Sequence, residues 1–199
     1  LKNARFSYTI DRQSLDARKK NKAFIHWNLR VGVSSPALKK SKHKPPVEKK
    51  LVIPHKKRGQ KIIVVGSGPA GFFAGYTLLL AGFDVTIIEQ GPEVEQRFKD
   101  IVTFERDGVL DETSNYAFGE GGAGTFSDGK LTSRTKSITA ERKFIFDTYV
   151  EAGAPPEISW MAHPHIGSDN LRKIAKNLRR QFREKGGTML FNTKVTAVD

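Results

Sequence analysis

The chain has 199 residues, of which 38% are hydrophobic and 28% charged, a composition typical of one globular domain or one domain with a small appendage. It contains no cysteine, which excludes disulfide bridges, thiolate metal sites and CxxC redox pairs. No apolar run reaches the roughly 18 residues that span a membrane, and the first residues lack the apolar stretch of a secretion signal. We therefore expect a cytoplasmic protein, or one of an organellar interior such as a plastid.

The formal net charge of +13 is concentrated in one segment. Residues 34–58 carry a net charge of +8, whereas the rest of the chain carries +5. A Lys- and Pro-rich run of this kind is typical of a solvated linker or arm. We therefore expect a basic linker at residues 34–60. Nucleic acid is an unfavoured partner, because residues 39–58 lack the aromatic side chains on which bases stack.

Residues 1–33 precede this linker and are expected to form a small α+β module. The polar stretch at residues 8–20 favours a turn or a short helix. Residues 23–33 (AFIHWNLRVGV) alternate or run apolar, which favours a strand.

Residues 61–89 have the pattern of a βαβ unit. KIIVVG, from residue 61, is a continuous β-branched run that predicts a strand buried on both faces of a parallel sheet. Helical spacing follows to Gly82, and FDVTIIE at 83–89 predicts a second buried strand. The fold class is therefore α/β, with a Rossmann-like domain over residues 61–199.

Residues 66–71 (GSGPAG), called the phosphate turn below, place Gly66, Gly68 and Gly71 at GxGxxG spacing. Gly66 permits the tight turn, Gly68 lets a pyrophosphate approach, and Gly71 lets the helix pack close to the strand. The helix then offers unpaired N–H groups to phosphates. Glu89 ends the next strand and can accept both ribose hydroxyls, whereas it would repel a 2′-phosphate. These features predict a dinucleotide site for NAD or FAD that rejects NADP.

Beyond residue 90 the periodicity fades, and residues 119–130 (GEGGAGTFSDGK), called the glycine loop, contain five glycines. We expect this loop to form a second wall of the cofactor site, with backbone N–H groups from Gly121, Gly122 and Gly124. Helices are expected at 139–152, capped by Thr139, and at 168–185, capped by Ser168 with a solvated Lys/Arg-rich face. The alternating residues 188–198 predict a last strand.

VVGSGPAGFFAGYTLLLAGFDVTIIEQG resembles the N-terminal FAD-binding signature of flavoproteins of the glutathione-reductase type, which have two dinucleotide domains. More specifically, SNYAFGEGGAGTFSDGKLTSR and HIGSDNLRKIAKNLR resemble a family of uncharacterised FAD-dependent dehydrogenases, also described as NAD(P)/FAD-dependent oxidoreductases. The resemblance implies FAD as cofactor, with NAD(P)H as a candidate electron donor. The later Gly-Asp motif of that group is missing, so we expect a fragment carrying an incomplete FAD-binding domain.

The resemblance also implies roles for single residues. Arg97 is expected near the adenosine or pyrophosphate, and Val195, on the last strand, beside the adenine or simply in the core. Lys130 is a hypothetical cation near the flavin; the alternatives are a surface lysine or a pair with Asp128. The candidate cofactor-binding residues are Gly66, Gly68, Pro69, Ala70, Gly71, Glu89, Gln90, Arg97, Gly121, Gly122, Ala123, Gly124, Thr125, Lys130 and Val195.

The sequence predicts an FAD-dependent oxidoreductase that transfers hydride or electrons to or from an unidentified substrate. The missing CxxC argues against the disulfide-reductase branch. Two other readings are an RNA-associated flavoprotein that uses the basic arm at 39–58, and a non-catalytic dinucleotide-binding protein. His163 and His165 flank a proline, which suits an extended turn better than a metal site. No metal site and no catalytic residue are predicted.

Overall fold

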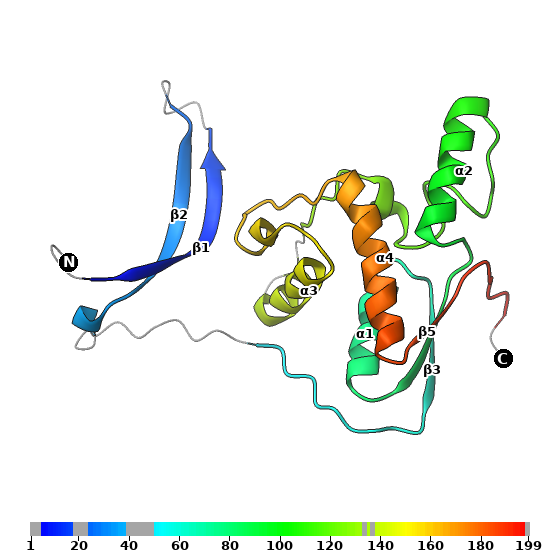
Figure 1. The fold of residues 1–199 in the computed structure, drawn as a ribbon, viewed down its shortest axis with the longest axis horizontal. Helices are drawn as coiled ribbons and strands as arrows, with labels where there is room; N and C mark the ends of the chain where they lie inside the picture. Colours follow the sequence, from blue (N-terminus) through cyan, green and yellow to red (C-terminus); the bar gives the residue numbers. More distant parts are fainter. Residues whose placement is uncertain (1–4, 18–23, 39–49, 133–134, 136–137, 198–199) are drawn as a thin grey trace.

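The computed structural model describes residues 5–17, 24–38, 50–132, 135 and 138–197 (Figure 1). The strands are β1 (Ser7–Asp16), β2 (His26–Ser34), β3 (Lys61–Val65), β4 (Asp84–Ile88) and β5 (Thr188–Leu190). The α-helices are α1 (Pro69–Leu80), α2 (Val94–Asp107), α3 (Thr139–Glu151) and α4 (Ser168–Glu184). Single turns of 3₁₀ helix occur at Pro36–Leu38, Ala123–Phe126 and Pro156–Ser159.

An antiparallel hairpin of β1 and β2 forms the N-terminal part of the described chain. The predicted strand at 23–33 is confirmed by β2, but the turn or short helix expected at 8–20 is wrong for residues 8–16, which belong to β1. The reason is cross-strand pairing: Tyr8 lies opposite Val33 and Leu15 opposite Trp27, so apolar side chains gather on one face. Residues 18–20 of that prediction lie outside the described residues, and no α-helix occurs in the described part of the expected α+β module.

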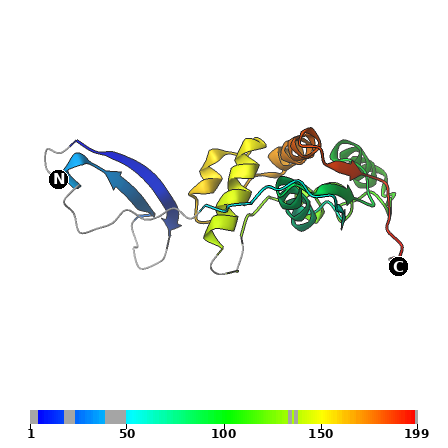
Figure 2. The same ribbon diagram turned by 90° about the horizontal axis from the view of Figure 1, so that it is seen from below.

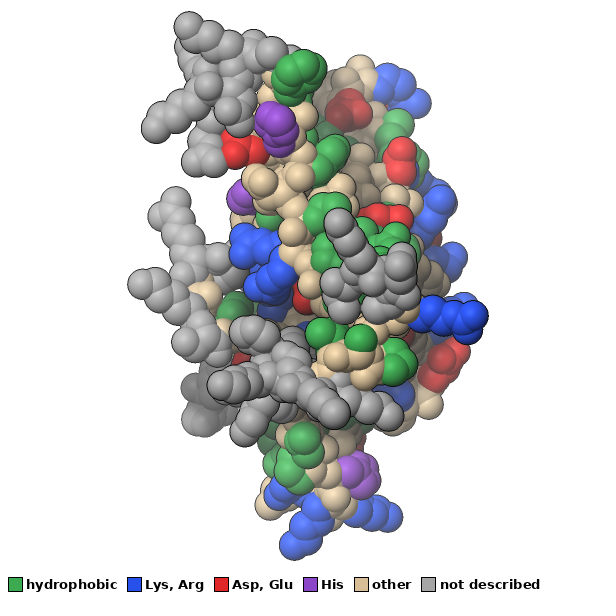
Figure 3. All heavy atoms as spheres, turned by 90° about the vertical axis from the view of Figure 1, so that its left-hand side faces the viewer, with side chains coloured by type: hydrophobic (Ala, Val, Ile, Leu, Met, Phe, Trp, Pro, Cys, Tyr) green, Lys and Arg blue, Asp and Glu red, His purple; other side chains and the backbone are tan. Residues whose placement is uncertain are grey.

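The hairpin lies at one end of the molecule and touches the rest through its backbone (Figure 2). The N–H of Gln13 donates to Trp160 O at 2.9 Å, and the N–H of Ala162 donates to Gln13 O at 2.8 Å. The apolar face of the hairpin remains exposed, and the view of that end shows hydrophobic side chains at the surface beside basic ones (Figure 3).

A parallel sheet in the order β3-β4-β5 forms the second unit and confirms the predicted βαβ pattern. Helices α1 and α4 pack on one face of it, where α1 contributes Phe72 and α4 contributes Phe182, with ring centroids 6.1 Å apart. This arrangement is a Rossmann-like α/β fold. The core residues are Phe72, Tyr76, Val85, Ile87, Phe146, Tyr149, Ala152, Ala154, Ile158, Ile166, Ile174, Leu178, Phe182 and Met189.

The opposite face of the sheet is open at β3. We predicted burial of this strand on both faces, but Ile63 and Val65 are 65% and 62% exposed. Their side chains point away from α1, because alternate residues of a strand face opposite sides. No segment within the described residues covers them, so that half of the prediction is wrong.

Helix α2 lies in the stretch where the periodicity fades, and the sequence did not predict it. Helices α3 and α4 confirm the two that were predicted, although Thr139 and Ser168 are their first helical residues and do not cap them. The last strand is shorter than expected: β5 ends at Leu190, and Val195 lies beyond it, half-buried, in irregular structure. The expectation that Val195 lies on this strand is therefore wrong.

Part of the basic linker packs against the end of α1. The N–H groups of Lys56 and Arg58 donate to the carbonyls of Ala81 and Gly82, and His55 Nδ1 bonds to Leu80 O at 2.9 Å. Carbonyls at a helix C-terminus need such partners, and the negative end of the helix dipole favours nearby basic side chains. Residues 55–58 are therefore hydrogen-bonded to the folded unit, although their side chains are exposed. Residues 39–49 of the predicted linker and arm lie outside the described residues.

Candidate functional site

The phosphate turn has the geometry that its glycines predict. Gly66 adopts φ +94°, a left-handed conformation that favours glycine. A Cβ added at Gly71 would overlap the carbonyl oxygen of Gly66, so only glycine lets α1 pack this close to β3. Pro69 occupies the first position of α1, and no side chain caps this helix. The N–H groups of Ala70 and Gly71 in the first turn therefore remain available to an anion.

Glu89 closes the site from the end of β4. Its carboxylate is buried, and Oε2 accepts the backbone N–H of Ser67 at 2.9 Å and the Ser67 hydroxyl at 2.8 Å. Oε1 accepts the N–H of Gly91 at 3.0 Å. Burial alone would raise the pKa of Glu89, but the donors of Gly91 and Ser67 outweigh it and hold this pKa below its ordinary value. The carboxylate is thus kept ionised, and the Ser67 hydroxyl uses one of the acceptor positions that a ribose hydroxyl needs.

The glycine loop packs directly against the phosphate turn. A Cβ added at Gly122 would lie 3.2 Å from Gly68 Cα, and one added at Gly91 would lie 2.6 Å from Gly119 Cα. Gly122 therefore lets the loop approach the turn, whereas a Cβ added at Gly68 would meet only Gly122 Cα, at an ordinary contact distance of 3.9 Å. The expectation that Gly68 lets a pyrophosphate approach stays a prediction. A Cβ at Gly66 or at Gly124 would meet nothing within 4 Å, so these two glycines border open space.

Arg97 holds the glycine loop from the side of α2. Its side chain is fully buried, with 0% exposure, and its guanidinium donates to backbone carbonyls. The acceptors are Asn115 O (2.9 Å), Tyr116 O (3.0 Å), Glu120 O (2.7 Å) and Gly122 O (2.8 Å). Burial lowers the pKa of Arg97 to about 10, so it stays charged at neutral pH. Arg97 shapes the loop through these bonds, with its guanidinium fully buried. The expectation that Arg97 lies near the adenosine or pyrophosphate stays a prediction.

A second buried arginine, Arg179, holds the same loop from the side of α4. Its Nη1 lies 3.2 Å from Glu120 Oε2 and 2.6 Å from Glu93 Oε2, and its Nη2 lies 2.9 Å from Glu95 Oε2. Glu120 is 3% exposed and also accepts the N–H of Val94 at 2.8 Å. Burial raises the pKa of Glu120 to about 7, although Val94 and Arg179 favour its ionised form. The basic face predicted for α4 is therefore not entirely solvated.

The other predicted site residues lie around this centre. Thr125 is buried in the glycine loop and donates its hydroxyl to Glu120 O at 3.2 Å, while Ala123 is exposed and Gln90 is half-buried. Lys130 forms an exposed ion pair of 2.9 Å with Asp128, one of the two alternatives to a flavin-facing cation. Val195 is the one candidate in irregular structure beyond β5.

His163 and His165 are both exposed, and His165 forms a backbone bridge with Lys130. Within the described ranges, no group of three His, Asp or Glu side chains could hold a metal ion. The helices of those same ranges are too short or too polar to cross a membrane.

Sequence reasoning missed Ser67, Glu120 and Arg179. Ser67 sits between the first two glycines of the turn, where its identity is free in the GxGxxG pattern. The only signal for the other two is that Glu120 and Arg179 are opposite charges next to small or apolar residues, and no spacing rule links them. Their proximity follows from the packing of α4 on the loop.

Two similarities to known proteins bear on this site. Residues 64–118 match the model of the NAD(P)-binding Rossmann-like domain family. Over 197 residues the chain is 38% identical to an uncharacterised protein of Clostridium beijerinckii, a stretch that covers 95% of this chain and 37% of that protein. The chain thus spans a little more than a third of that relative's length. The family match includes the phosphate turn, Glu89 and Arg97, and it supports a nucleotide cofactor and an oxidoreductase-type role.

Proposed function

We propose that the protein is an FAD-dependent oxidoreductase and that the described site holds the adenosine and pyrophosphate part of FAD. The observation that carries this proposal is the buried, ionised Glu89 at the end of β4, beside a phosphate turn that borders open space at Gly66. The resemblance of this stretch to the FAD signature of the glutathione-reductase type favours FAD over NAD. The glycine loop supports it further, because it supplies a second backbone wall next to the turn.

The residues fit such a dinucleotide. The free N–H groups of Ala70 and Gly71 suit the pyrophosphate, since they lie at an uncapped helix N-terminus. Glu89 can accept a ribose hydroxyl once the Ser67 hydroxyl rotates away, because backbone donors still hold the carboxylate in place. Since burial and ionisation of Glu89 exclude a second negative charge, a 2′-phosphate is rejected.

A bound flavin supplies hydride and single-electron transfer, while the protein positions and polarises it. In this proposal Lys130 is the cation closest to the flavin or the substrate. Its contact with Asp128 is exposed, so a ligand carrying negative charge can compete for Lys130. The substrate and the electron donor belong to parts of the reaction that these residues do not specify.

Titration of the purified protein with FAD, NAD⁺ and NADP⁺ tests the proposal. We expect FAD to bind with quenching of its fluorescence, the visible absorption bands of an oxidised flavin to persist after gel filtration, and NADP⁺ not to bind. Glu89→Gln should weaken FAD binding at least about tenfold, because a carboxylate forms stronger hydrogen bonds than an amide. The matched control is Glu184→Gln, an exposed carboxylate at the end of α4. A colourless protein that takes up no FAD would overturn the proposal.

A second candidate is a protein that binds NAD at this site, which the description of the matched family favours. Glu89 is compatible with either dinucleotide, because both carry an adenosine with free ribose hydroxyls. The same titration distinguishes them: saturable binding of NAD⁺ together with no uptake of FAD would establish the second candidate.

A further inference from the structure

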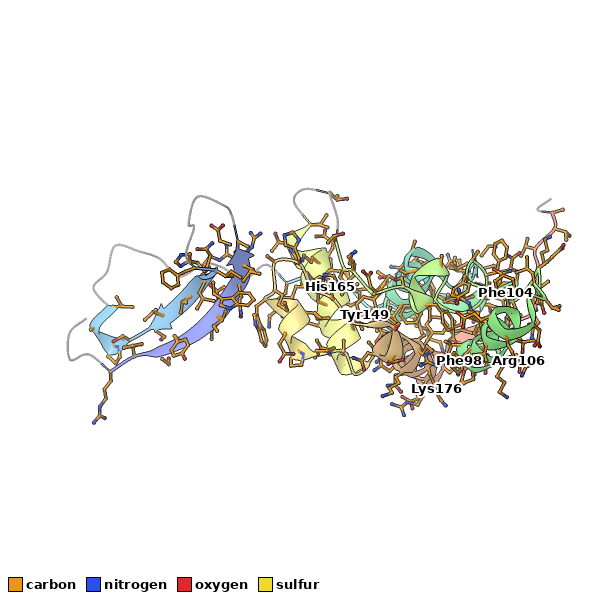
Figure 4. All side chains as sticks on the ribbon, turned by 90° about the horizontal axis from the view of Figure 1, so that it is seen from above. Phe98, Phe104, Arg106, Tyr149, His165 and Lys176 are labelled. Atoms are coloured by element: carbon orange, nitrogen blue, oxygen red, sulfur yellow. The ribbon has the colours of Figure 1, made fainter. Side chains whose placement is uncertain are left out.

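A cavity of about 140 Å³ lies between α1, α3, α4 and the glycine loop. Its buried walls are mostly apolar, with Phe72 from α1, Ile174 and Leu178 from α4, and Met189 from β5. In Figure 4, Tyr149 lies where α3 faces α4, and it is also part of the lining. A dinucleotide is far too large for this space. An apolar cavity of roughly 150 Å³, by contrast, holds a benzene-sized molecule.

One end of the cavity is polar and buried. Glu120, Thr125 and Arg179 line it, and each is less than 10% exposed. Oε2 of Glu120 accepts the N–H of Val94 and faces Arg179. Oε1 of Glu120 and Nη1 of Arg179 are both buried and have no hydrogen-bond partner within the described residues, although Nη1 lies at ion-pair distance from Glu120 Oε2. A buried acceptor without a donor is unfavourable, so a donor inside the cavity would be bound there in preference to an apolar group.

The other end of the cavity reaches the surface. Gly124, Ser127 and Lys130 belong to the lining and are exposed, so a small molecule can enter between them. The cavity therefore combines an entrance, an apolar body and, at its buried end, an unsatisfied acceptor of Glu120 beside an unsatisfied donor of Arg179.

We propose that this cavity binds a small, neutral, largely apolar molecule of about benzene size that carries one hydrogen-bond donor, and that Oε1 of Glu120 receives this donor. The phosphate turn contributes Ser67 and Pro69 to the lining, so the cavity adjoins the proposed dinucleotide site. The ligand class follows from the lining. Aromatic and aliphatic walls select the body, and Glu120 Oε1 beside Arg179 Nη1 selects a hydroxyl group, which can donate to the carboxylate and accept from the guanidinium.

Phenol and benzene form a matched pair of test ligands, because they differ by one hydroxyl. In a cavity without an acceptor, phenol would bind more weakly than benzene, since its hydroxyl would lose its hydrogen bonds to water. With Glu120 as acceptor we expect the reverse order, with phenol binding about tenfold more tightly. The measurement is made without dinucleotide and above pH 7, where Glu120 is ionised.

Methionine methyl NMR reports the site directly, because the chain has two methionines and only Met189 lines the cavity. Met161 lies at the contact with the hairpin and serves as the internal control. The two signals are assigned with Met161→Leu. Both ligands should shift the Met189 methyl signal through their ring currents and leave the Met161 signal in place.

Three variants test whether Glu120 is the acceptor and whether the ligands lie in the cavity. Glu120→Leu removes the acceptor and should abolish the preference for phenol, while Glu184→Leu, on the exposed end of α4, should retain it. Ala175→Leu adds bulk to the cavity wall and should weaken both ligands at least about tenfold. If Glu120→Leu does not give the methyl spectrum of a folded protein, Glu120→Gln replaces it and should reduce the preference severalfold.

Four results would overturn the proposal. They are a Met189 signal that neither ligand moves, equal or reversed affinities in the wild type, an undiminished preference for phenol in the Glu120 variants, and parallel shifts of Met161 that reveal non-specific binding. A cavity filled only by water would give the first of these results.

Discussion

One buried carboxylate, Glu89, lies against the phosphate turn and another, Glu120, belongs to the glycine loop, and the two differ in what surrounds them. Glu89 receives three donors from Ser67 and Gly91, and its pKa is lowered. Glu120 receives one N–H and shares Arg179 with two other carboxylates, and burial raises its pKa to about 7. Several donors hold the pKa of Glu89 down, whereas deeper burial and the neighbouring carboxylates of Glu93 and Glu95 raise that of Glu120.

The two regions also differ in what fixes their shape. Glycine packing and backbone hydrogen bonds define the turn, and most of its partners are close in sequence. The loop is held by arginines from two helices, Arg97 on α2 and Arg179 on α4. A substitution in the turn should therefore change stability mainly by adding atoms where no room exists. A substitution at the arginines that hold the loop should change stability mainly by removing charge and hydrogen bonds.

The largest expected effect is that of Arg97→Met. The variant leaves at least four loop carbonyls without their donor in a buried setting, and we expect a loss of unfolding free energy of about 3–5 kcal/mol. Urea unfolding measures it. Arg106→Met is the control, because this residue of the same helix is exposed and bonds only to the neighbouring Asp107 (Figure 4). Equal midpoints for the two variants would contradict the role given to Arg97.

The pH dependence of stability should separate the two carboxylates. In the folded protein the pKa of Glu120 is raised from 4.5 to about 7. The contribution of Glu120 to the free energy of unfolding is therefore fully present below pH 4.5, and it is lost as the pH rises through 7. The loss is about 3 kcal/mol at most. In the folded protein the pKa of Glu89 is lowered. The contribution of Glu89 to the free energy of unfolding is therefore present above pH 4.5, the ordinary pKa of this side chain, and is lost at more acidic pH.

Urea titrations across the pH range check this separation. Glu120→Gln should flatten the profile between pH 4.5 and 7, and Glu89→Gln should flatten it below pH 4.5. If the profile of Glu120→Gln keeps the wild-type slope between pH 4.5 and 7, then Glu120 is not the group that titrates there.

A smaller effect is expected within the turn. Gly71→Ala places a methyl group against the Gly66 carbonyl and should lower stability by about 1–3 kcal/mol, because the backbone must move apart. Gly124→Ala is the matched control, since a Cβ there meets nothing within 4 Å. Thermal unfolding of both variants gives the comparison, and an unchanged melting temperature for Gly71→Ala would contradict the close packing of α1 on β3.

The smallest effect is that of Lys130→Met on stability. The pair with Asp128 is exposed at both ends and screened by solvent, so we expect no measurable change in the unfolding midpoint. If the proposed function is right, the same variant should instead shift the reduction potential of the bound flavin. A stability change together with an unchanged potential would assign Lys130 to the fold alone.

The turn could be predicted from the sequence because its determinants are local. The apolar runs of β3 and β4, the spacing of Gly66 and Gly71, and the position of Glu89 all lie within 30 residues and follow general rules. The strand β1 was missed because its apolar residues are interrupted by polar ones at a bulge between Ile10 and Arg12, which shifts the alternation.

The loop and its supports could be predicted only in part. Helix α2 buries Val94, Arg97 and Ile101, and an arginine on the buried face breaks the apolar period by which a helix is recognised. The same holds for Arg179 among the buried residues of α4. Arg97 donates to backbone carbonyls, and Arg179 pairs with carboxylates far away in sequence. Every residue has a backbone carbonyl, so the residue types do not show which carbonyls accept from Arg97.

The backbone contacts of the hairpin continue as far as the entrance of the cavity. Gln13 is hydrogen-bonded to Trp160 and Ala162, and the segment that follows these residues bonds to residues 128–131 through the N–H groups of Leu131, Ile166 and Gly167. Main-chain bonds therefore link the hairpin at one end of the molecule to Lys130 at the entrance of the cavity, so two features that lie far apart in the sequence share one hydrogen-bonded path.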